Sequence, residues 1–271
     1  MKAIRHITDT TLLNFAGFMP PKERVEWAGM LDAIGVHEIV MPLCSRRELA
    51  ACAQVIHTAK QAVYVRMETA QLSKALRMGV TAVFLEIPIS YPMIYTNYRK
   101  NKDWARKTLL ECGELLANTD VVTTLVLADA SRAEPCFLES LVQLTAGMRV
   151  DKIVAKDLMG IQTLSACAEL IGLMLTFGYD LGYEGNDRFG LSVANTIQAL
   201  RMGALYAGCC LGGLGGGCDL RRLLQTTNRV FDYGINRKGA EQLDRTFKQQ
   251  YRSERMLRRQ DSRNADSCFP G

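Results

Sequence analysis

The chain has 271 residues, of which 48% are hydrophobic and 23% are charged, so it is long enough to bury the core of one α/β barrel of about 250 residues. It contains no apolar run of about 18 residues and no signal-peptide pattern, which predicts a cytoplasmic protein rather than a membrane-spanning or exported one. The nine cysteines form no C-x-x-C pair and the three histidines lie away from the predicted active face, so neither disulfides nor a zinc site is expected.

Short β-branched runs alternate with longer amphipathic runs along the chain. Strands are predicted at residues 4–9, 37–42, 62–67, 82–87, 121–127, 152–156, 180–183 and 204–210. Helices are predicted at residues 21–34, 46–59, 70–78, 104–118, 134–146, 162–177 and 191–202. Eight strands that alternate with helices predict an α/β fold of the (β/α)8 TIM barrel type, with a parallel sheet.

The sequence predicts a basic helical extension in the C-terminal part of the chain. Residues 237–263 hold nine basic side chains and four acidic ones, which accounts for the whole net charge of +5. Leu243, Phe247 and Tyr251 recur every four residues and predict a helix that docks on the barrel or on a partner chain. Nucleic acid is not the expected partner, because no aromatic side chains interleave a basic surface. The predicted domains are a barrel over residues 1–235 and a C-terminal helix and tail over residues 236–271.

In a (β/α)8 barrel the chemistry gathers at the C-terminal ends of the strands. The polar residues at the predicted strand ends are Asp9, Arg66, Glu68, Ser90, Asp129, Arg132, Lys156, Asp157, Glu184, Asn186 and Arg188. Four of these are basic and come from four different strands, so we expect them to converge on one mouth. Such a mouth is suited to an anionic ligand, for example a dicarboxylate or a phosphate.

Several short motifs occur in a fixed order along these elements. They read ITDTTL at residues 7–12, KERV at 22–25, ADASRAEP at 128–135, DLMG at 157–160, GLSVAN at 190–195 and GGLGGGC at 212–218. Together they resemble the DRE-TIM metallolyases, a family of HMG-CoA lyase and pyruvate carboxyltransferase type barrels that includes homocitrate, isopropylmalate and citramalate synthases. The ADASRAEP form is most similar to homocitrate synthases of the nitrogenase-cofactor type, which implies a role in nitrogen fixation.

The resemblance implies catalytic groups that this sequence has changed. The family continues after DTTL with R-D-G-E-Q, whereas Leu13 and Asn14 follow here. Its metal-binding His-x-His pair reads Glu184 and Asn186, and an expected histidine after Ser90 reads Met93. Loss of one group that stabilises a developing oxyanion lowers a rate by about 10²–10³. The substitutions therefore predict that the parent chemistry is impaired.

The changed positions limit the metal that the mouth could hold. Asn14, Glu184 and Asn186, the positions of the predicted metal ligands, offer only oxygen atoms. Oxygen ligands suit a hard divalent cation such as Mg²⁺ or Mn²⁺ rather than zinc. The sequence specifies no cofactor, and a divalent cation is one of the alternatives.

Lys156 has three alternative roles. The run KDLMG at residues 156–160 is similar to the KDMAG run of biotin-dependent carboxyltransferases, in which the lysine is carbamylated and binds a metal. Some class I aldolases form a Schiff base with a lysine at the same strand end. The third alternative, which we favour, is an ion pair with Asp157, Asp129 or Glu184.

The glycine-rich run at residues 212–217 has two alternative roles. It could cradle a phosphate, as loops after the last strands of such barrels do, or it could be a flexible loop without a ligand. Asp219 is expected to cap the helix that follows. Cys209, Cys210 and Cys218 lie close to this loop, and core packing is the expected role because no histidine accompanies them.

The resemblance implies an acyltransferase of homocitrate-synthase type that condenses acetyl-CoA with a small 2-oxo acid. The predicted catalytic residues are Glu184 and Lys156. The predicted substrate-binding residues are Arg66, Arg132, Arg188 and Ser90, and the predicted supporting residues are Asp9, Asp129 and Asp157.

Two alternatives remain open on the sequence. The first is a non-catalytic paralogue, or pseudoenzyme, that pairs with an active homologous synthase in a heterodimer; family barrels also form homodimers. The second is a lyase or aldolase with changed chemistry at Lys156.

Overall fold

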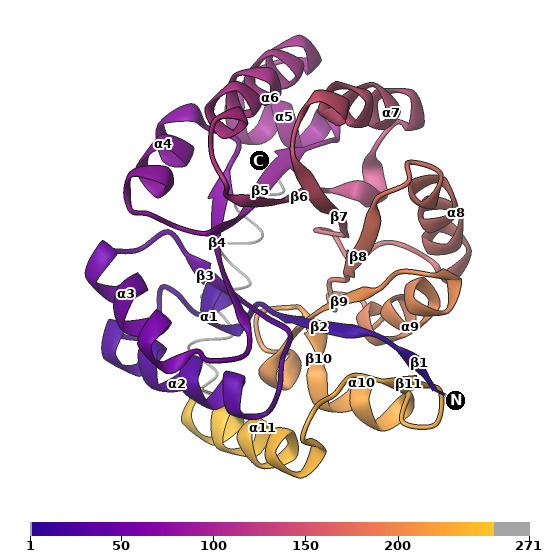
Figure 1. The fold of residues 1–271 in the computed structure, drawn as a ribbon. Helices are drawn as coiled ribbons and strands as arrows, with labels where there is room; N and C mark the ends of the chain where they lie inside the picture. Colours follow the sequence, from indigo (N-terminus) through magenta and orange to yellow (C-terminus); the bar gives the residue numbers. More distant parts are fainter. Residues whose placement is uncertain (1, 252–271) are drawn as a thin grey trace.

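Eight parallel strands close into a barrel in the computed structural model, which describes residues 2–251 (Figure 1). Each strand pairs with its neighbour in chain order, and the last pairs with the first. The strands are β2 (His6–Asp9), β3 (Glu38–Pro42), β4 (Lys60–Arg66), β5 (Ala82–Pro88), β6 (Val122–Ala128), β7 (Val150–Lys156), β8 (Asp180–Glu184) and β9 (Tyr206–Cys210). The predicted fold class is therefore confirmed.

Helices surround the barrel, and most of them cover its outer wall, whereas the short helix that follows β2 lies inside the ring of outer helices (Figure 1). They are α1 (Thr11–Asn14), α2 (Pro21–Ala33), α3 (Arg46–Val55), α4 (Thr69–Arg77), α5 (Tyr91–Tyr98), α6 (Lys102–Ala117), α7 (Pro135–Leu144), α8 (Leu164–Leu175), α9 (Ser192–Met202), α10 (Leu220–Thr226) and α11 (Arg237–Tyr251). Ser45, Asn101 and Thr163 accept a hydrogen bond from the backbone N–H three residues further on, which fixes where α3, α6 and α8 begin.

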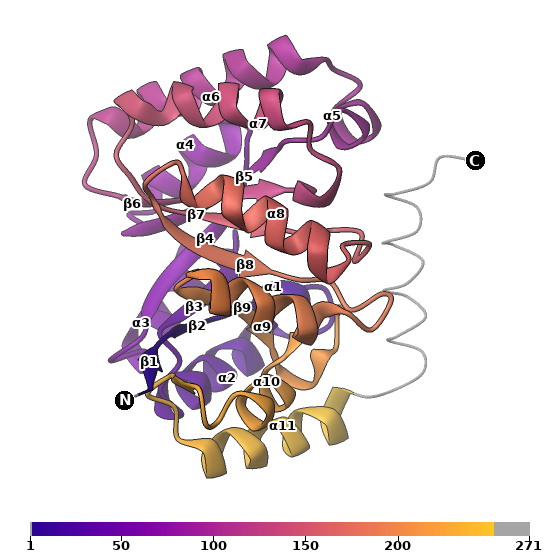
Figure 2. The ribbon, with the colours of Figure 1, turned by 90° about the vertical axis from the view of Figure 1, so that its right-hand side faces the viewer.

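The interior of the barrel is layered. Val40, Ala62, Phe84, Val126 and Val154, one from each of β3 to β7, form an apolar plug at its middle. Side chains two residues apart on a strand face the same way, so the next inward positions lie above and below this plug. The buried ion pair of Lys152 with Glu38 lies below the plug, towards the starts of the strands. The candidate site lies above the plug. In the side view of Figure 2, α5 and the chain's start lie at opposite ends of the barrel.

The structure corrects three boundaries and adds helices. The segment predicted as one strand at residues 4–9 is split, because β1 (Ala3–Ile4) pairs with β11 (Phe231–Asp232) outside the barrel. The helix predicted at 46–59 ends at Val55, because the carboxylate of Asp32 accepts hydrogen bonds from the backbone of residues 57–59. The helix predicted at 134–146 ends at Leu144 and continues as a short 3₁₀ turn. The helices α1 and α5 had no predicted counterpart.

The C-terminal helix α11 docks on the barrel of its own chain. Leu243, Phe247 and Tyr251 are 7%, 0% and 4% exposed, which confirms the predicted apolar face. The ring of Phe247 packs edge-on against Phe15 and Trp27, with centroids 4.9 and 5.0 Å apart. This face is therefore not available to a partner chain, which leaves the barrel as the docking surface. The rest of the predicted extension, residues 252–271, lies outside the described residues.

Two further expectations concern membranes and thiols. Across residues 2–251 no helix has both the length and the apolar character needed to cross a bilayer. Cys209, Cys210 and Cys218 are completely buried, as expected for core cysteines. Burial raises the pKa of the Cys210 thiol, which keeps it protonated and unreactive.

Candidate functional site

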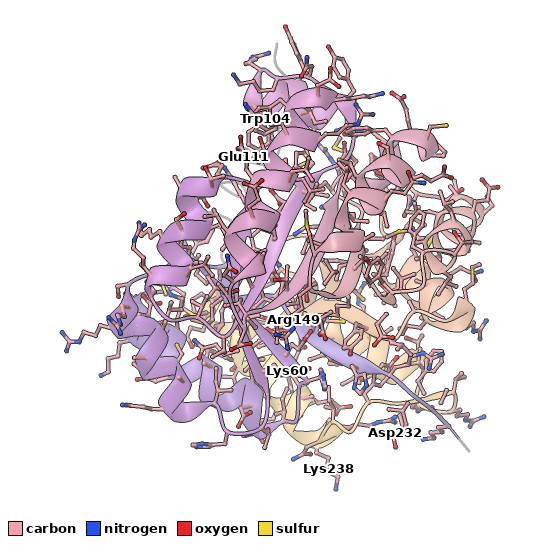
Figure 3. The ribbon with its side chains drawn as sticks, turned by 45° about the horizontal axis from the view of Figure 1, so that its top comes forward. Lys60, Trp104, Glu111, Arg149, Asp232 and Lys238 are labelled. Atoms are coloured by element: carbon pink, nitrogen blue, oxygen red, sulfur yellow. The ribbon has the colours of Figure 1, made fainter. Side chains whose placement is uncertain are left out.

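The C-terminal ends of the strands bring charged side chains to one end of the barrel, which we call the mouth. Lys156 lies in register between Ala128 of β6 and Glu184 of β8. It is two positions beyond Val154 of the plug and therefore faces the barrel axis. Lys60 begins β4 and therefore marks the opposite end (Figure 3).

Lys156 and Glu184 form an ion pair in the mouth. The Nζ atom of Lys156 lies 3.0 Å from Oε1 of Glu184, and the two side chains are only 13% and 12% exposed. Burial acts to lower the pKa of Lys156, but the charges of Glu184 and Glu86 outweigh it and raise that pKa above its ordinary value. The two predicted catalytic residues are thus brought together, and the favoured ion pair of Lys156 is present.

Two residues that the sequence did not single out complete this group. The phenolic oxygen of Tyr64 lies 3.5 Å from Nζ of Lys156 and donates a hydrogen bond to the carboxylate of Glu86. Glu86 is 8% exposed and stands two residues after Phe84 of the plug. A charged residue at an inward-facing position of an otherwise apolar strand was the signal that could have revealed it.

Gly208 makes room for Glu184. A Cβ atom at position 208 would lie 2.9 Å from both Cβ and Cγ of Glu184, closer than real Cβ contacts allow. Only glycine on β9 therefore lets the Glu184 side chain take its position across the barrel. Gly208 is thus a third residue of the mouth that the sequence did not single out.

Arg132 is held by Asp129 rather than extended into the mouth. Its Nε atom lies 3.0 and 2.9 Å from the two oxygens of Asp129, and its Nη2 atom lies 2.7 Å from one of them. Ser90 is completely buried, donates to Asp129 and accepts from the backbone of Met93 at the start of α5. The substrate-binding roles of Arg132 and Ser90 stay predictions.

Arg66 and Arg188 are the exposed basic residues of the predicted set. Arg66 ends β4, and Arg188 lies in the loop between β8 and α9. The backbone N–H of Arg188 donates to the side-chain oxygen of Asn186 at 2.9 Å, which fixes the start of this loop. An exposed guanidinium can bind a carboxylate with two parallel hydrogen bonds, so these two side chains suit the predicted substrate class.

Asp157 and Asp9 support the loops that follow their strands. Asp157 accepts hydrogen bonds from three backbone N–H groups within residues 159–162, at 2.9–3.3 Å. Asp9 is completely buried and accepts from the backbone N–H and the hydroxyl of Thr11, at 2.9 and 3.1 Å. Both carboxylates thus hold the backbone that follows their strands, and their supporting role at the site stays a prediction.

Asp9 is expected to make stability depend on pH. Burial raises its pKa to about 7, whereas the same carboxyl in the unfolded chain titrates near its ordinary value of 3.8. The protonated form therefore stabilises the fold at acid pH, and this contribution is lost as the pH rises from about 4 to 7, by about 1 kcal/mol per pH unit. Between pH 5 and 7 the free energy of unfolding of wild type should fall by about 2 kcal/mol more than that of Asp9→Asn.

Urea unfolding at the two pH values measures this difference. Asp103→Asn is the matched control, because the Asp103 side chain is 85% exposed. Equal pH dependence in wild type and Asp9→Asn would contradict the expectation.

The predicted metal ligands do not fit a divalent cation as they are arranged. The one carboxylate among them, Glu184, is paired with the ammonium of Lys156. The side-chain amides of Asn14 and Asn186 donate to neighbouring oxygens at 3.2 and 3.0 Å. Within residues 2–251 there is no group of three or more His, Cys, Asp or Glu side chains placed to hold a metal ion. The Mg²⁺ or Mn²⁺ site stays a prediction that these contacts do not favour.

The glycine-rich loop borders the mouth and is fixed by α11. The backbone N–H of Gly212 donates to Asp244 of α11 at 2.7 Å, and the backbone oxygen of Gly216 accepts from Asp187 at 2.6 Å. Asp219 accepts from the backbone of Arg222 at 2.9 Å, which confirms it as the cap of α10. One N–H group of the loop thus already has an acidic partner, and the phosphate cradle remains a prediction.

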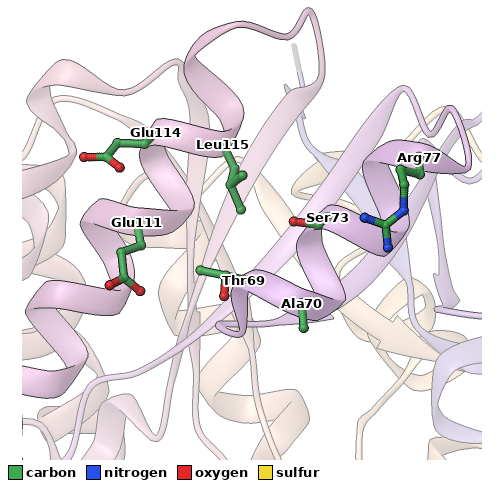
Figure 4. A pocket seen from close by; sticks show the side chains of 7 residues that line it. All are labelled: Thr69, Ala70, Ser73, Arg77, Glu111, Glu114 and Leu115. Atoms are coloured by element: carbon green, nitrogen blue, oxygen red, sulfur yellow. The ribbon is translucent and has the colours of Figure 1, made fainter.

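Two surface pockets differ in their relation to the mouth. The larger lies on the outer wall between α4 and α6 and contains none of the predicted site residues (Figure 4). Its lining residues are Thr69, Ala70, Ser73, Arg77, Glu111, Glu114 and Leu115. The smaller lies beside α5, where Met93 and Arg132 contribute to its wall. Of these two pockets, the second is thus the one that a predicted site residue, Arg132, helps to line.

Comparisons with known proteins identify the family of this chain. A family model described as HMGL-like matches residues 11–226. The homocitrate synthase subunit alpha of Clostridium pasteurianum is 25% identical over 238 residues, which cover 83% of this chain and 88% of that protein. A homocitrate synthase of a Frankia strain is 27% identical, and the match covers 71% of this chain but only 50% of that protein.

The fold is also found in solved structures. An HMG-CoA lyase from Brucella melitensis superposes with a TM-score of 0.81 at 14% identity, and the match covers 93% of this chain and 100% of that chain. At this identity the superposition concerns the fold alone.

Proposed function

Because this chain belongs to the HMGL-like family, we propose that it is a homocitrate-synthase-like protein that takes part in a Claisen condensation of an acyl-CoA with a small 2-oxo acid. The observation that carries the proposal is the Lys156–Glu184 pair at the mouth of a barrel whose relative of similar length is named a homocitrate synthase subunit. Acetyl-CoA is the proposed acyl donor.

The condensation requires two kinds of group from the protein. A base removes a proton from the α-carbon of the acyl group, and the carbanion formed attacks the keto carbon of the 2-oxo acid. The keto oxygen takes up the negative charge and then a proton, and water hydrolyses the thioester to release CoA. Glu184 is the carboxylate for the first task, and the ammonium of Lys156 stabilises the oxygen in the second. The exposed Arg66 and Arg188 would bind the substrate carboxylates.

The direct test is an assay of the purified full chain with acetyl-CoA and a panel of 2-oxo acids. Mass spectrometry should detect a condensation product and free CoA, and neither should form when the oxo acid is omitted. We expect Lys156→Met to lower the rate by about 10²–10³. Lys102→Met is the matched control, because Lys102 forms a surface ion pair with Glu134.

A second candidate function is that of a non-catalytic subunit. The relative of similar length is named subunit alpha, and two cations of this mouth, Lys156 and Arg132, are already paired with carboxylates of the same chain. In that case product would form only after a homologous synthase chain is added, and the two chains would co-elute in gel filtration. Absence of product both alone and with a homologous synthase would overturn both candidates.

Lyase or aldolase chemistry through a Schiff base at Lys156 has less support. A Schiff base forms from the neutral amine, and the charges of Glu184 and Glu86 hold Lys156 as the ammonium. Borohydride treatment in the presence of a 2-oxo acid should therefore leave the mass of the chain unchanged. A reduced adduct on the peptide that contains Lys156 would reinstate this alternative.

A further inference from the structure

The mouth contains more negative than positive buried charge. Glu86 and Glu184 come from β5 and β8, and Lys156 lies on β7 between them in chain order. The two carboxylates are charge-coupled to this one ammonium, and Tyr64 bridges Lys156 and Glu86 through its hydroxyl. Without the ammonium, the charges of these two carboxylates would lie in a poorly hydrated interior without this counter-charge. Such an arrangement is unfavourable unless a cation is present.

The atoms that surround the ammonium are those that a hard divalent cation also prefers. Glu184 supplies a carboxylate oxygen at 3.0 Å and Tyr64 a phenolic oxygen at 3.5 Å. Gly208 on β9 leaves the space through which the Glu184 side chain reaches this position. The environment is therefore built for a positive charge, and a side chain of the protein supplies it.

We propose that the ammonium of Lys156 is the built-in cation of this mouth and fills the place that a divalent metal ion would otherwise take between Glu86 and Glu184. The proposal concerns the wild-type chain and its binding of metal ions, so it stands whether or not the chain catalyses a condensation. It accounts for the pairing of Glu184, the one carboxylate among the predicted metal ligands, with an ammonium. A carbonyl or carboxylate oxygen entering the mouth would then meet an ammonium rather than a metal ion.

The test is a titration of the purified full chain with Mn²⁺, followed by calorimetry and by the EPR signal of the free ion. Wild type should bind Mn²⁺ no more tightly than the surface control Lys102→Met. Lys156→Met removes the charge but keeps the length of the side chain, and it should bind one Mn²⁺ at least about tenfold more tightly than wild type, a difference of 1.4 kcal/mol. The double variant Lys156→Met with Glu184→Gln should lose this gain.

Thermal unfolding provides a second readout that is independent of activity. Mn²⁺ should raise the unfolding temperature of Lys156→Met and leave that of wild type unchanged. A folded Lys156→Met chain without increased Mn²⁺ affinity would overturn the proposal. If Lys156→Met does not fold, Mn²⁺ binding by wild type is compared with that by Glu184→Gln. The proposal is overturned if wild type binds one Mn²⁺ and Glu184→Gln does not. It is supported if both bind Mn²⁺ equally weakly.

Discussion

Lys152→Met is expected to lower the free energy of unfolding by about 3–5 kcal/mol. Lys152 is 1% exposed and forms an ion pair with Glu38, which also accepts a hydrogen bond from Thr8 at 2.7 Å. Burial lowers the pKa of Lys152 and Glu38 only partly offsets this, so the intact pair adds little net stability. Removal of the ammonium alone is costly, because the carboxylate of Glu38 would remain buried without a counter-charge.

Urea unfolding of two further variants separates this effect from a general loss of packing. The double variant Lys152→Met with Glu38→Leu should recover most of the lost stability, because it removes both charges and keeps apolar volume. Lys107→Met should change stability by less than about 0.5 kcal/mol, since Lys107 is 80% exposed and 3.8 Å from Glu111. A loss below about 1 kcal/mol for Lys152→Met would show that Glu38 is rehydrated or protonated in the barrel.

Phe247→Ala is expected to lower the free energy of unfolding by a similar amount, about 3–5 kcal/mol. Phe247 is completely buried, and its ring contacts Phe15, Trp27 and Tyr251 at centroid distances of 4.9, 5.0 and 4.8 Å. The truncation would leave a cavity between α11 and the barrel. Because Asp244 of the same helix holds Gly212, the glycine-rich loop at the mouth should also become mobile.

Urea unfolding measures the stability, and hydrogen exchange of residues 212–217 reports on the loop. Phe189→Ala is the matched control, since Phe189 is 63% exposed and its truncation leaves no cavity. If Phe247→Ala changed stability no more than this control, α11 would be shown to dock without contributing to the core.

The barrel could be predicted because its signals are local. β-branched runs of the right length alternate with amphipathic runs, and strand ends are marked by a change from apolar to polar residues. The same rule placed Lys156 and Glu184 at one mouth. Helix α5 was not predicted, because its residues 91–98 include a proline and three tyrosines and therefore have little helix propensity.

The pairing of side chains within the mouth could not be predicted, because it depends on register between strands. The charge of Glu86 stands out in the run AVFLEIP, but its contact with Tyr64 depends on how β4 pairs with β5. The ion pair of Arg132 with Asp129 depends on the left-handed backbone conformation of Asp129, whose φ of 65° places the carboxylate against the guanidinium. Neither the register between neighbouring strands nor an unusual φ value can be inferred from composition or residue spacing.

The ring is closed by segments that lie far apart along the chain, and this bears on how the protein is made. His6 of β2 pairs with Tyr206 of β9, and Ala3 of β1 pairs with Phe231 of β11. During synthesis on the ribosome, β2 therefore keeps an unpaired edge until residue 210 has emerged. The ring therefore closes only after β9 has been made, and a chain interrupted before residue 206 would expose the unpaired edge of β2.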